Sequence, residues 1–260
     1  MLFSRQELKK ISQKCAKKIV KAIPQEQFFH QPYEHAVIDN FFPEELANSC
    51  LNNFPPLSDP CWEHQNDKDI EVKYRTNWKS EFDIPVGILD AVQILNSSIV
   101  MKAMSTLMRI KKLIPDPYYT GGGLNVTTRG GLLDVHVDGN YHDATGLNRR
   151  LNAIVYLNPN YQSDWGGEFG VYDKTGDNCV KKIEPLYNRL IIFNTHDTSF
   201  HGLPDPVNFP KDEQRRSIIL YYYTKEKRRE EEIVVDEPHS ALWKKRGIAD
   251  KKGNKKRLFT

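Results

Sequence analysis

The sequence predicts an α+β protein with a mainly β core, and three observations point to that class. From Tyr118 onward, short apolar runs, alternating or continuous, are separated by Gly, Asn and Asp. No long helical pattern interrupts these runs, which favours an antiparallel sandwich or barrel over alternating α/β units. Helical periodicity is confined to the N-terminal half, so we expect its helices to cover one sheet.

The first predicted element is an amphipathic helix over residues 5–23, which Pro24 would end. Its outer face is rich in lysine. We interpret this face as solvated rather than as a membrane-surface or nucleic-acid contact. The apolar positions recur about 3.6 residues apart and are Leu8, Ile11, Cys15, Ile19 and Ile23.

A strand and a turn are predicted from Tyr33, followed by a helix that begins near Pro43 and runs to about Asn53. His35 and His64 have no partners at ligand spacing and are expected to be structural. The other elements predicted in this half are one or two short strands, at Glu71–Arg75, within otherwise loop-like residues 54–84, and helices over residues 85–96 and 97–111.

The second half is predicted to contain seven strands: Leu124–Thr128, Leu132–Val137, Leu151–Leu157, Glu168–Tyr172, Val180–Ile183, Arg189–Phe193 and Arg216–Tyr223. We therefore divide the chain into a supporting region (1–117), a β core (118–224) and a charged C-terminal extension (225–260). The basic last dozen residues are expected to be mobile and solvated.

The composition limits the classes of protein to which the chain can belong. The chain has 260 residues, of which 39% are hydrophobic and 27% charged, enough for one sizeable domain with a buried core. A net charge of +3 gives no argument for a nucleic-acid partner. No run approaches the roughly 18 apolar residues that span a bilayer, so no membrane contact is expected.

The cysteines and the charged N-terminus favour a cytoplasmic location. The N-terminal segment does not resemble a secretory signal. The cysteines are scattered without a CxxC pair, so reduced thiols are expected; they are Cys15, Cys50, Cys61 and Cys179.

The candidate site begins with His136 and Asp138, two residues apart behind an apolar lead-in. Side chains alternate along a strand, so this spacing places both on one face. His201 in Ser-Phe-His-Gly-Leu is the best-placed third ligand, and His142 and His196 are its rivals. Two histidines and one carboxylate on one face of a metal are typical of non-haem Fe(II) oxygenases.

A carboxylate-binding arginine is predicted beyond His201, at the start of an apolar strand. Arginine suits bidentate recognition of a carboxylate. Arg215 shares one strand face with Ser217, whereas Arg216 lies on the other face. We favour Arg215 as the inward residue, with Arg216 as the alternative.

These motifs together resemble, in order and spacing, the 2-oxoglutarate- and Fe(II)-dependent dioxygenase superfamily, within it the prolyl 4-hydroxylase and prolyl-hydroxylase-domain group. The resemblance covers about residues 118–224. It rests on His136-x-Asp138, Tyr156-Leu-Asn, Gly166-Gly-Glu-Phe, Pro185-Leu-Tyr-Asn-Arg-Leu-Ile-Ile-Phe, His201-Gly and Arg215-x-Ser. The implied fold is a double-stranded β-helix, jelly-roll or cupin-like, with N-terminal helices packed on one sheet.

The resemblance implies roles for the site residues. His136, Asp138 and His201 would bind iron and form the catalytic centre. Arg215 would pair with the distal carboxylate of 2-oxoglutarate, assisted by Tyr156, for which the alternative is a core aromatic. The resemblance also places Arg149, Asn125 and Thr127 on the substrate or cofactor side. The alternative for Arg149 is a solvated position at the start of a strand.

The implied cofactors are Fe(II), 2-oxoglutarate and O2, with ascorbate as a further candidate. The implied reaction hydroxylates an aliphatic C–H, with release of succinate and CO2, on a prolyl or other residue of a peptide or protein. The alternatives are the same chemistry on a small molecule or sugar precursor, a non-enzymatic β-helix ligand-binding module, and a nucleic-acid demethylase, which needs a base pocket. Oligomeric state is left open.

Overall fold

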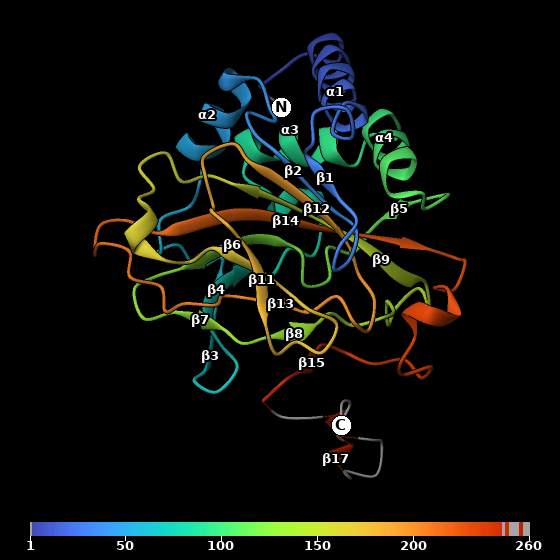
Figure 1. Ribbon diagram of the computed structural model, residues 1–260. Helices are drawn as coiled ribbons and strands as arrows, with labels where there is room; N and C mark the ends of the chain where they lie inside the picture. Colours follow the sequence, from blue (N-terminus) through green and yellow to red (C-terminus); the bar gives the residue numbers. More distant parts are fainter. Residues whose placement is uncertain (1, 246–247, 250–254, 257–260) are drawn as a thin grey trace.

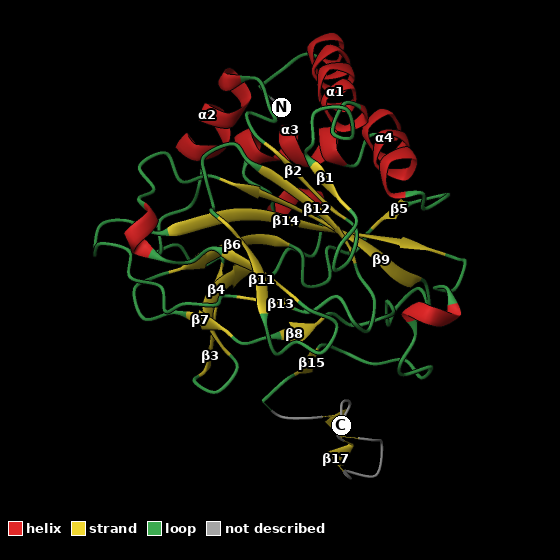
Figure 2. Ribbon diagram, viewed as in Figure 1, coloured by secondary structure: helices red, strands yellow, loops and turns green. Residues whose placement is uncertain are grey.

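The computed structural model describes residues 2–245, 248–249 and 255–256, and shows the predicted double-stranded β-helix (Figures 1 and 2). A large antiparallel sheet faces a smaller one, and the helices cover the outer side of the large sheet. The large sheet runs in the order β1 (Phe28–Phe29), β2 (His35–Ile38), β12 (Leu190–Asn194), β9 (Asn148–Tyr156), β14 (Arg215–Thr224), β6 (Gly123–Thr127), β4 (Glu71–Thr76) and β3 (Trp62–Asp67).

The two faces of the large sheet have different chemistry because side chains alternate along each strand. On β14, Ile218 and Leu220 point outward and pack into the main hydrophobic core with the helices. The alternate residues Arg215 and Ser217 lie on the inner face, opposite Thr127 and Asn125 of β6. The outer face therefore supplies stability, while the inner face presents polar groups to the space between the sheets.

The four helices largely match the prediction, and helix α1 shows one difference. It spans Arg5–Val20 with a capping box formed by Ser4 and Glu7, and so ends before Pro24. Ile23 lies beyond the helix and is 54% exposed, so it is not part of the apolar face. The other helices are α2 (Glu44–Asn52), α3 (Val86–Leu95) and α4 (Ser98–Met108).

The smaller sheet runs in the order β11 (Cys179–Ile183), β10 (Phe169–Tyr172), β13 (His201–Gly202), β8 (His136–Val137) and β15 (Leu242–Trp243). The strand predicted over Leu132–Val137 divides into two parts that join different sheets. Strand β7 (Leu132–Leu133) pairs with β4 of the large sheet, whereas β8 pairs with β13 of the small one. The chain thus crosses between the sheets just before the candidate site.

Residues 54–84 contain two strands, within the one or two predicted, but only the position of the second was placed by the sequence. Strand β4 extends the predicted Glu71–Arg75 by one residue, and β3 pairs with it in an antiparallel hairpin that enlarges the large sheet. Alternation in β3 is hidden because polar residues occupy both of its faces, as in Trp-Glu-His-Gln-Asn-Asp.

The described part of the C-terminal extension packs on the small sheet. We call residues 225–245 the C-terminal strap. It crosses below the sheets to β15, which pairs with β8 (Figure 1). Most of the last dozen residues, predicted to be mobile, lie outside the described residues. Strands β16 (Ile248–Ala249) and β17 (Lys255–Lys256) form a separate pair, and β5 (Ile114–Pro115) pairs with β14.

Among the described residues, no single helix is long and apolar enough to cross a membrane. Taken together, helices α3 and α4 are long and apolar enough for a span by length and composition only, and they meet at a 49° bend.

Candidate metal centre and cofactor pocket

The structure brings the three predicted ligands together at the mouth between the two sheets. His136 of β8 and His201 of β13 are direct cross-strand partners, with ring centroids 4.3 Å apart, and Asp138 immediately follows β8. One ligand atom from each side chain lies within 4.8 Å of the other two, and all three residues are buried. Within the described residues, no other group of His, Cys, Asp or Glu meets this geometry.

Both imidazoles are oriented by carbonyl groups of their own chain. Nδ1 of His136 lies 2.8 Å from the Asp134 carbonyl oxygen, and Nδ1 of His201 lies 3.0 Å from that of Ser199. A carbonyl only accepts, so each Nδ1 carries the proton and each Nε2 keeps its lone pair. Phe169 also stacks on the His201 ring at 5.4 Å. Such fixed tautomers are typical of metal-binding histidines.

The protonation states also suit a metal. Burial lowers the pKa of His136 to about 3, with a further contribution from His201, and burial likewise lowers the pKa of His201. Burial alone would raise the pKa of Asp138, but Arg149, then the two imidazoles and a hydrogen bond from Asn152, hold it well below its usual range. At neutral pH the site therefore consists of two neutral imidazoles and one carboxylate, the forms that bind metals.

Asp138 is held by two residues of β9. Asn152 Nδ2 donates to Asp138 Oδ2 at 2.7 Å, and an Arg149 NH2 nitrogen lies 3.3 Å from Asp138 Oδ1. Arg149 in turn donates to Asn152 Oδ1, and its guanidinium lies 3.5 Å from the centroid of the Tyr221 ring. Arg149, predicted on the substrate side or at a solvated strand entry, is thus mostly buried beside the carboxylate.

The rival histidines lie outside this group. His142 Nε2 bonds to Asp116 Oδ1 at 3.0 Å, and its Nδ1 accepts from backbone N–H groups of its own loop. His196 packs edge-on against Tyr33 and its Nδ1 contacts the Thr198 hydroxyl. Both imidazoles are therefore satisfied by local structural contacts.

The predicted arginine faces the same inner space. Arg215 Nε donates to the Gly167 carbonyl at 2.6 Å, and its NH2 group donates to the Tyr156 hydroxyl at 3.0 Å. Gly167 has a φ of +77°, and a Cβ there would lie 3.0 Å from the Arg215 side chain, so only glycine fits without displacement. The Tyr156 hydroxyl accepts from Arg215 and keeps its own proton available to donate.

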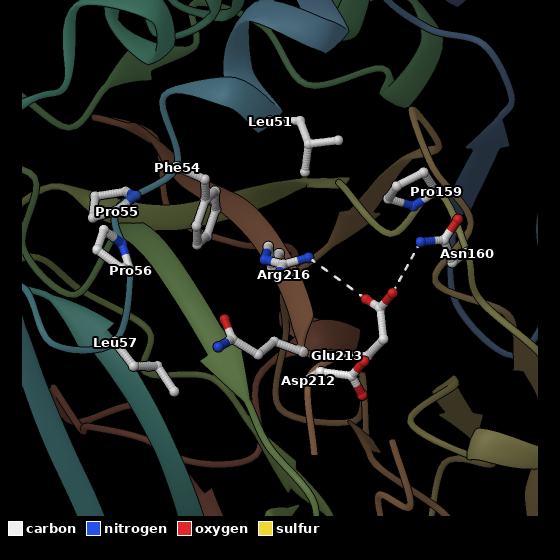
Figure 3. A pocket seen from close by; sticks show the side chains of 11 residues that line it. Leu51, Phe54, Pro55, Pro56, Leu57, Pro159, Asn160, Asp212, Glu213 and Arg216 are labelled. Carbon is white, nitrogen blue, oxygen red and sulfur yellow. Dashed lines mark hydrogen bonds and ion pairs between the residues drawn. The ribbon is translucent and has the colours of Figure 1, made fainter. Parts of the chain in front are cut away.

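Arg216 faces a different part of the molecule. It lines a groove of about 500 Å³ between the end of α2 and the loop at Asp212, where it pairs with Glu213 at 3.9 Å (Figure 3). This groove lies on the outer side of β14. The strand parity that separates Arg215 from Arg216 is thus observed.

Two buried polar atoms on the faces of β6 and β14 that Arg215 shares have no partner among the described residues. They are Nδ2 of Asn125 and Oγ of Ser217. Ser217 is the cross-strand partner of both Asn125 and Tyr156, so these side chains share the inner face with Arg215. Thr127, opposite Arg215, is buried on this face as well. Unsatisfied buried groups beside a cationic side chain fit a carboxylate such as that of 2-oxoglutarate.

Sequence reasoning missed several residues of the site. Asn152 lies in an apolar strand where only its partner, 14 residues away, gives it a role. Trp243 of the strap stacks on His136 with centroids 4.5 Å apart, yet it lies 107 residues further along the chain. Ser217 was part of the Arg-x-Ser motif, and its position on the Arg215 face was the available signal.

A double-stranded β-helix with two histidines and one carboxylate at its mouth defines the class of metal-dependent oxygenases. Within that class, residues 122–223 match the family model of the 2OG-Fe(II) oxygenase superfamily. This part of the chain is a 2OG-Fe(II) oxygenase domain, and Fe(II) and 2-oxoglutarate are its cofactors. The donor set and the Arg215 pocket described above fit both.

Solved structures share this fold at low sequence identity. A prolyl hydroxylase from Trichoplax adhaerens, in complex with a hypoxia inducible factor peptide fragment, is 19% identical with a TM-score of 0.57, covering 86% of this chain and 95% of that one. A prolyl-4-hydroxylase from Pseudomonas putida is 14% identical with a TM-score of 0.52, covering 81% and 98%. A prolyl 4-hydroxylase from Phytophthora capsici is 15% identical with a TM-score of 0.51, covering 86% and 67%. No curated protein sequence matches.

Proposed function

We propose that this dioxygenase hydroxylates an aliphatic C–H of a prolyl residue in a peptide or protein. When bound, Fe(II) and 2-oxoglutarate supply an oxidant made from O2, with loss of CO2 and formation of succinate, that inserts oxygen into a C–H bond. The observation that carries the proposal is the convergence of His136, Asp138 and His201 beside an inner-face Arg215 pocket with unsatisfied donors.

In this proposal the chain binds and orients the reactants. His136, Asp138 and His201 hold the metal through two Nε2 atoms and a carboxylate. Arg215 and Tyr156 bind the distal carboxylate of 2-oxoglutarate by charge-assisted hydrogen bonds. The low-dielectric inner face strengthens these contacts by excluding water.

The unpaired donors would complete this carboxylate pocket. Asn125 Nδ2 and Ser217 Oγ gain the partners that they lack. Thr127 and Arg149 border the same space and are proposed to contact cofactor or substrate. Arg149 would act from beside Asp138, which it contacts directly.

The prolyl substrate is supported by the fold that this chain shares with prolyl hydroxylases. The Trichoplax prolyl hydroxylase was solved in complex with a peptide fragment of hypoxia inducible factor. We transfer that substrate class to this chain as part of the proposal. The chain's own residues add a separate argument, given in the next subsection.

The test is anaerobic titration of the purified protein with Fe(II) and 2-oxoglutarate, followed by visible absorption. A keto acid chelated to Fe(II) should give a weak charge-transfer band in the wild type. His201→Ala should lose the band, whereas His64→Ala, which removes an exposed histidine of β3 outside the ligand group, should keep it. Mass spectrometry of proline-containing peptides after admission of O2 then tests the substrate by the gain of one oxygen atom.

Each result has a definite meaning. A band with hydroxylated proline supports both parts of the proposal. No band in the wild type contradicts the cofactor assignment for these residues. A band with succinate release, but only from substrates without proline, rejects the prolyl part alone.

A further inference from the structure

The C-terminal strap places an aromatic ring beside the metal centre. Trp243 is the cross-strand partner of His136, so both side chains lie on the inner face of the small sheet. The indole stacks on the imidazole with ring centroids 4.5 Å apart and an interplanar angle of 30°. Trp243 is only partly buried, so the indole keeps some exposed surface beside His136.

Buried contacts fix the strap in this position. Asp197, 1% exposed, pairs with Arg228 at 2.5 Å and accepts hydrogen bonds from the backbone N–H groups of Val234 and Val235. Near the other end, Asn140 Oδ1 accepts from the backbone N–H of His239. Trp243 is therefore presented on an ordered segment rather than on a free tail.

The strap also fits closely against the loop after the metal strand. A Cβ at Gly139 would lie 2.8 Å from the His239 carbonyl oxygen, so the two backbones meet where only glycine leaves room. On the outer face of the same strand, Leu242 packs with Val137 and its hydrophobic neighbours. The two neighbouring residues of β15 thus have different surroundings: Leu242 packs on the outer face, and Trp243 stacks on His136 on the inner face.

Strand β4 forms a charged wall on the inner face of the large sheet. Arg75 pairs in register with the inward residue Asn125, and Lys73 shares its face two residues away. Each cation has an acidic partner: Lys73 lies 3.0 Å from Glu71, and Arg75 lies 3.6 Å from Glu63. This wall is consequently balanced in charge and offers little to a strongly ionic substrate.

We infer that Trp243 is a specificity-determining residue that contacts the pyrrolidine ring of a prolyl substrate. Proline-rich segments dock on aromatic side chains because the ring is apolar and its backbone is preformed. The partly exposed indole of Trp243 would offer such an aromatic surface beside a ligand histidine, next to the reacting C–H. The inference rests on the proposed function. It identifies the strap as the element that would recognise the substrate.

The experiment measures binding of a short poly-L-proline peptide to the full chain, kept anaerobic with Fe(II) and 2-oxoglutarate. Tryptophan fluorescence reports contact at the indole, and calorimetry reports affinity independently. In the wild type the peptide should change the emission in a saturable way. Trp62→Phe, which removes a distant tryptophan beside Phe54, should leave both signals unchanged.

The variants at position 243 separate contact from structure. Trp243→Ala should weaken peptide binding by about tenfold, as expected for losing one aromatic contact. Trp243→Phe should abolish the emission change while retaining most of the affinity. Leu242→Ala is the matched control, because it removes strap packing on the outer face without touching the mouth; its affinity should stay near that of the wild type.

The failures are distinguishable. The inference is overturned if the wild type binds no poly-L-proline, if Trp243→Ala binds as well as the wild type, or if Leu242→Ala weakens binding as much as Trp243→Ala. In each case the charge-transfer band of the Fe(II)–2-oxoglutarate complex is recorded on the same samples. A normal band leaves the oxygenase assignment intact, and its absence in the wild type shows that the proposed function itself has failed.

Discussion

Strand parity gives two adjacent arginines unrelated environments. Arg215 is 8% exposed and bonds to Tyr156 and Gly167 on the inner face, whereas Arg216 lines the groove of Figure 3 on the outer side. Because the side chains alternate, the sequence Arg-Arg alone places one guanidinium on each side of the sheet. The pair is a natural internal control for the cofactor pocket.

We predict that Arg215→Lys raises the KM for 2-oxoglutarate by about tenfold or more, because lysine keeps the charge but loses the planar fork and its hydrogen bonds. Arg216→Lys should leave that KM unchanged. Steady-state kinetics of succinate formation would check both. The opposite ranking of the two variants would move the carboxylate pocket to the outer face and refute the arrangement described above.

A second prediction concerns Asn152, which bonds Asp138 but does not reach the metal position itself. Asn152→Ala should weaken metal binding by about 10- to 100-fold, the usual effect of losing a group that orients a ligand. Calorimetric titration with Mn(II) measures it without redox chemistry. The control is Asn160→Ala, which removes an exposed amide paired with Glu213 and should bind Mn(II) as the wild type does. Equal Mn(II) affinities in all three proteins would contradict the role of Asn152.

At this scale the local part of the site was predictable and the distant part was not. The spacing of His136 and Asp138 places them on one face of an extended chain. His201 and Arg215 followed from the order of motifs in the resemblance. Asn152 could not be found, because an asparagine in an apolar strand acquires meaning only from its partner across the sheet.

Among the elements, strand β2 contains a titratable group that should make the fold sensitive to acid. His35 is fully buried, and its Nε2 has no hydrogen-bond partner among the described residues. Burial, with a smaller contribution from the nearby Lys181 charge, lowers its pKa to about 4, against a partly opposing hydrogen bond to the Tyr33 carbonyl. The folded protein therefore binds this proton less well than the unfolded chain.

Because the folded pKa lies below the unfolded value of about 6.5, the stabilising effect is complete above pH 6.5 and is lost as the pH falls toward 4. We expect His35→Gln to reduce the pH dependence of unfolding free energy by up to about 3 kcal/mol over this window. Urea denaturation at several pH values measures it. Exposed His30→Gln should keep the wild-type slope, and an unchanged slope in His35→Gln would disprove the prediction.

Element boundaries were predictable where periodicity was strong and failed where one strand serves two sheets. Helices α3 and α4 begin and end within a few residues of the prediction. Residues 132–137 look like one strand, because nothing in their alternation shows that Leu132–Leu133 and His136–Val137 join different sheets. Tertiary pairing decides such breaks, and a single sequence does not display it.

For the whole molecule, cofactor binding should appear as stability, since a ligand that binds only the folded state stabilises it by mass action. At 100 times the dissociation constant, Mn(II) with 2-oxoglutarate should add about 2.7 kcal/mol to the unfolding free energy. Urea midpoints with and without ligand test this, and EDTA should reverse the effect. His201→Ala should show no shift; a shift as large as in the wild type would mean that the metal binds elsewhere.

The division of the chain into 1–117, 118–224 and 225–260 remains a prediction. The family match covers only residues 122–223, while the described structure shows contacts across all three parts. Helices α1 to α4 share the main core with β9, β12 and β14, and the strap pairs with β8. The charged composition of the extension gave no sign of this packing, because its hydrogen bonds, ion pairs and apolar contacts join it to residues far away in sequence.

The pairing of β15 with β8 also fixes when the small sheet can be completed during synthesis. Residues 136–137 leave the ribosome long before residues 242–243 do, so one edge of β8 stays unpaired even after β13 has been made. A nascent chain stopped before Leu242 would expose that edge to other strands. Completion of the small sheet is thereby tied to translation of the strap, and a chain released early would lack the indole that stacks on His136.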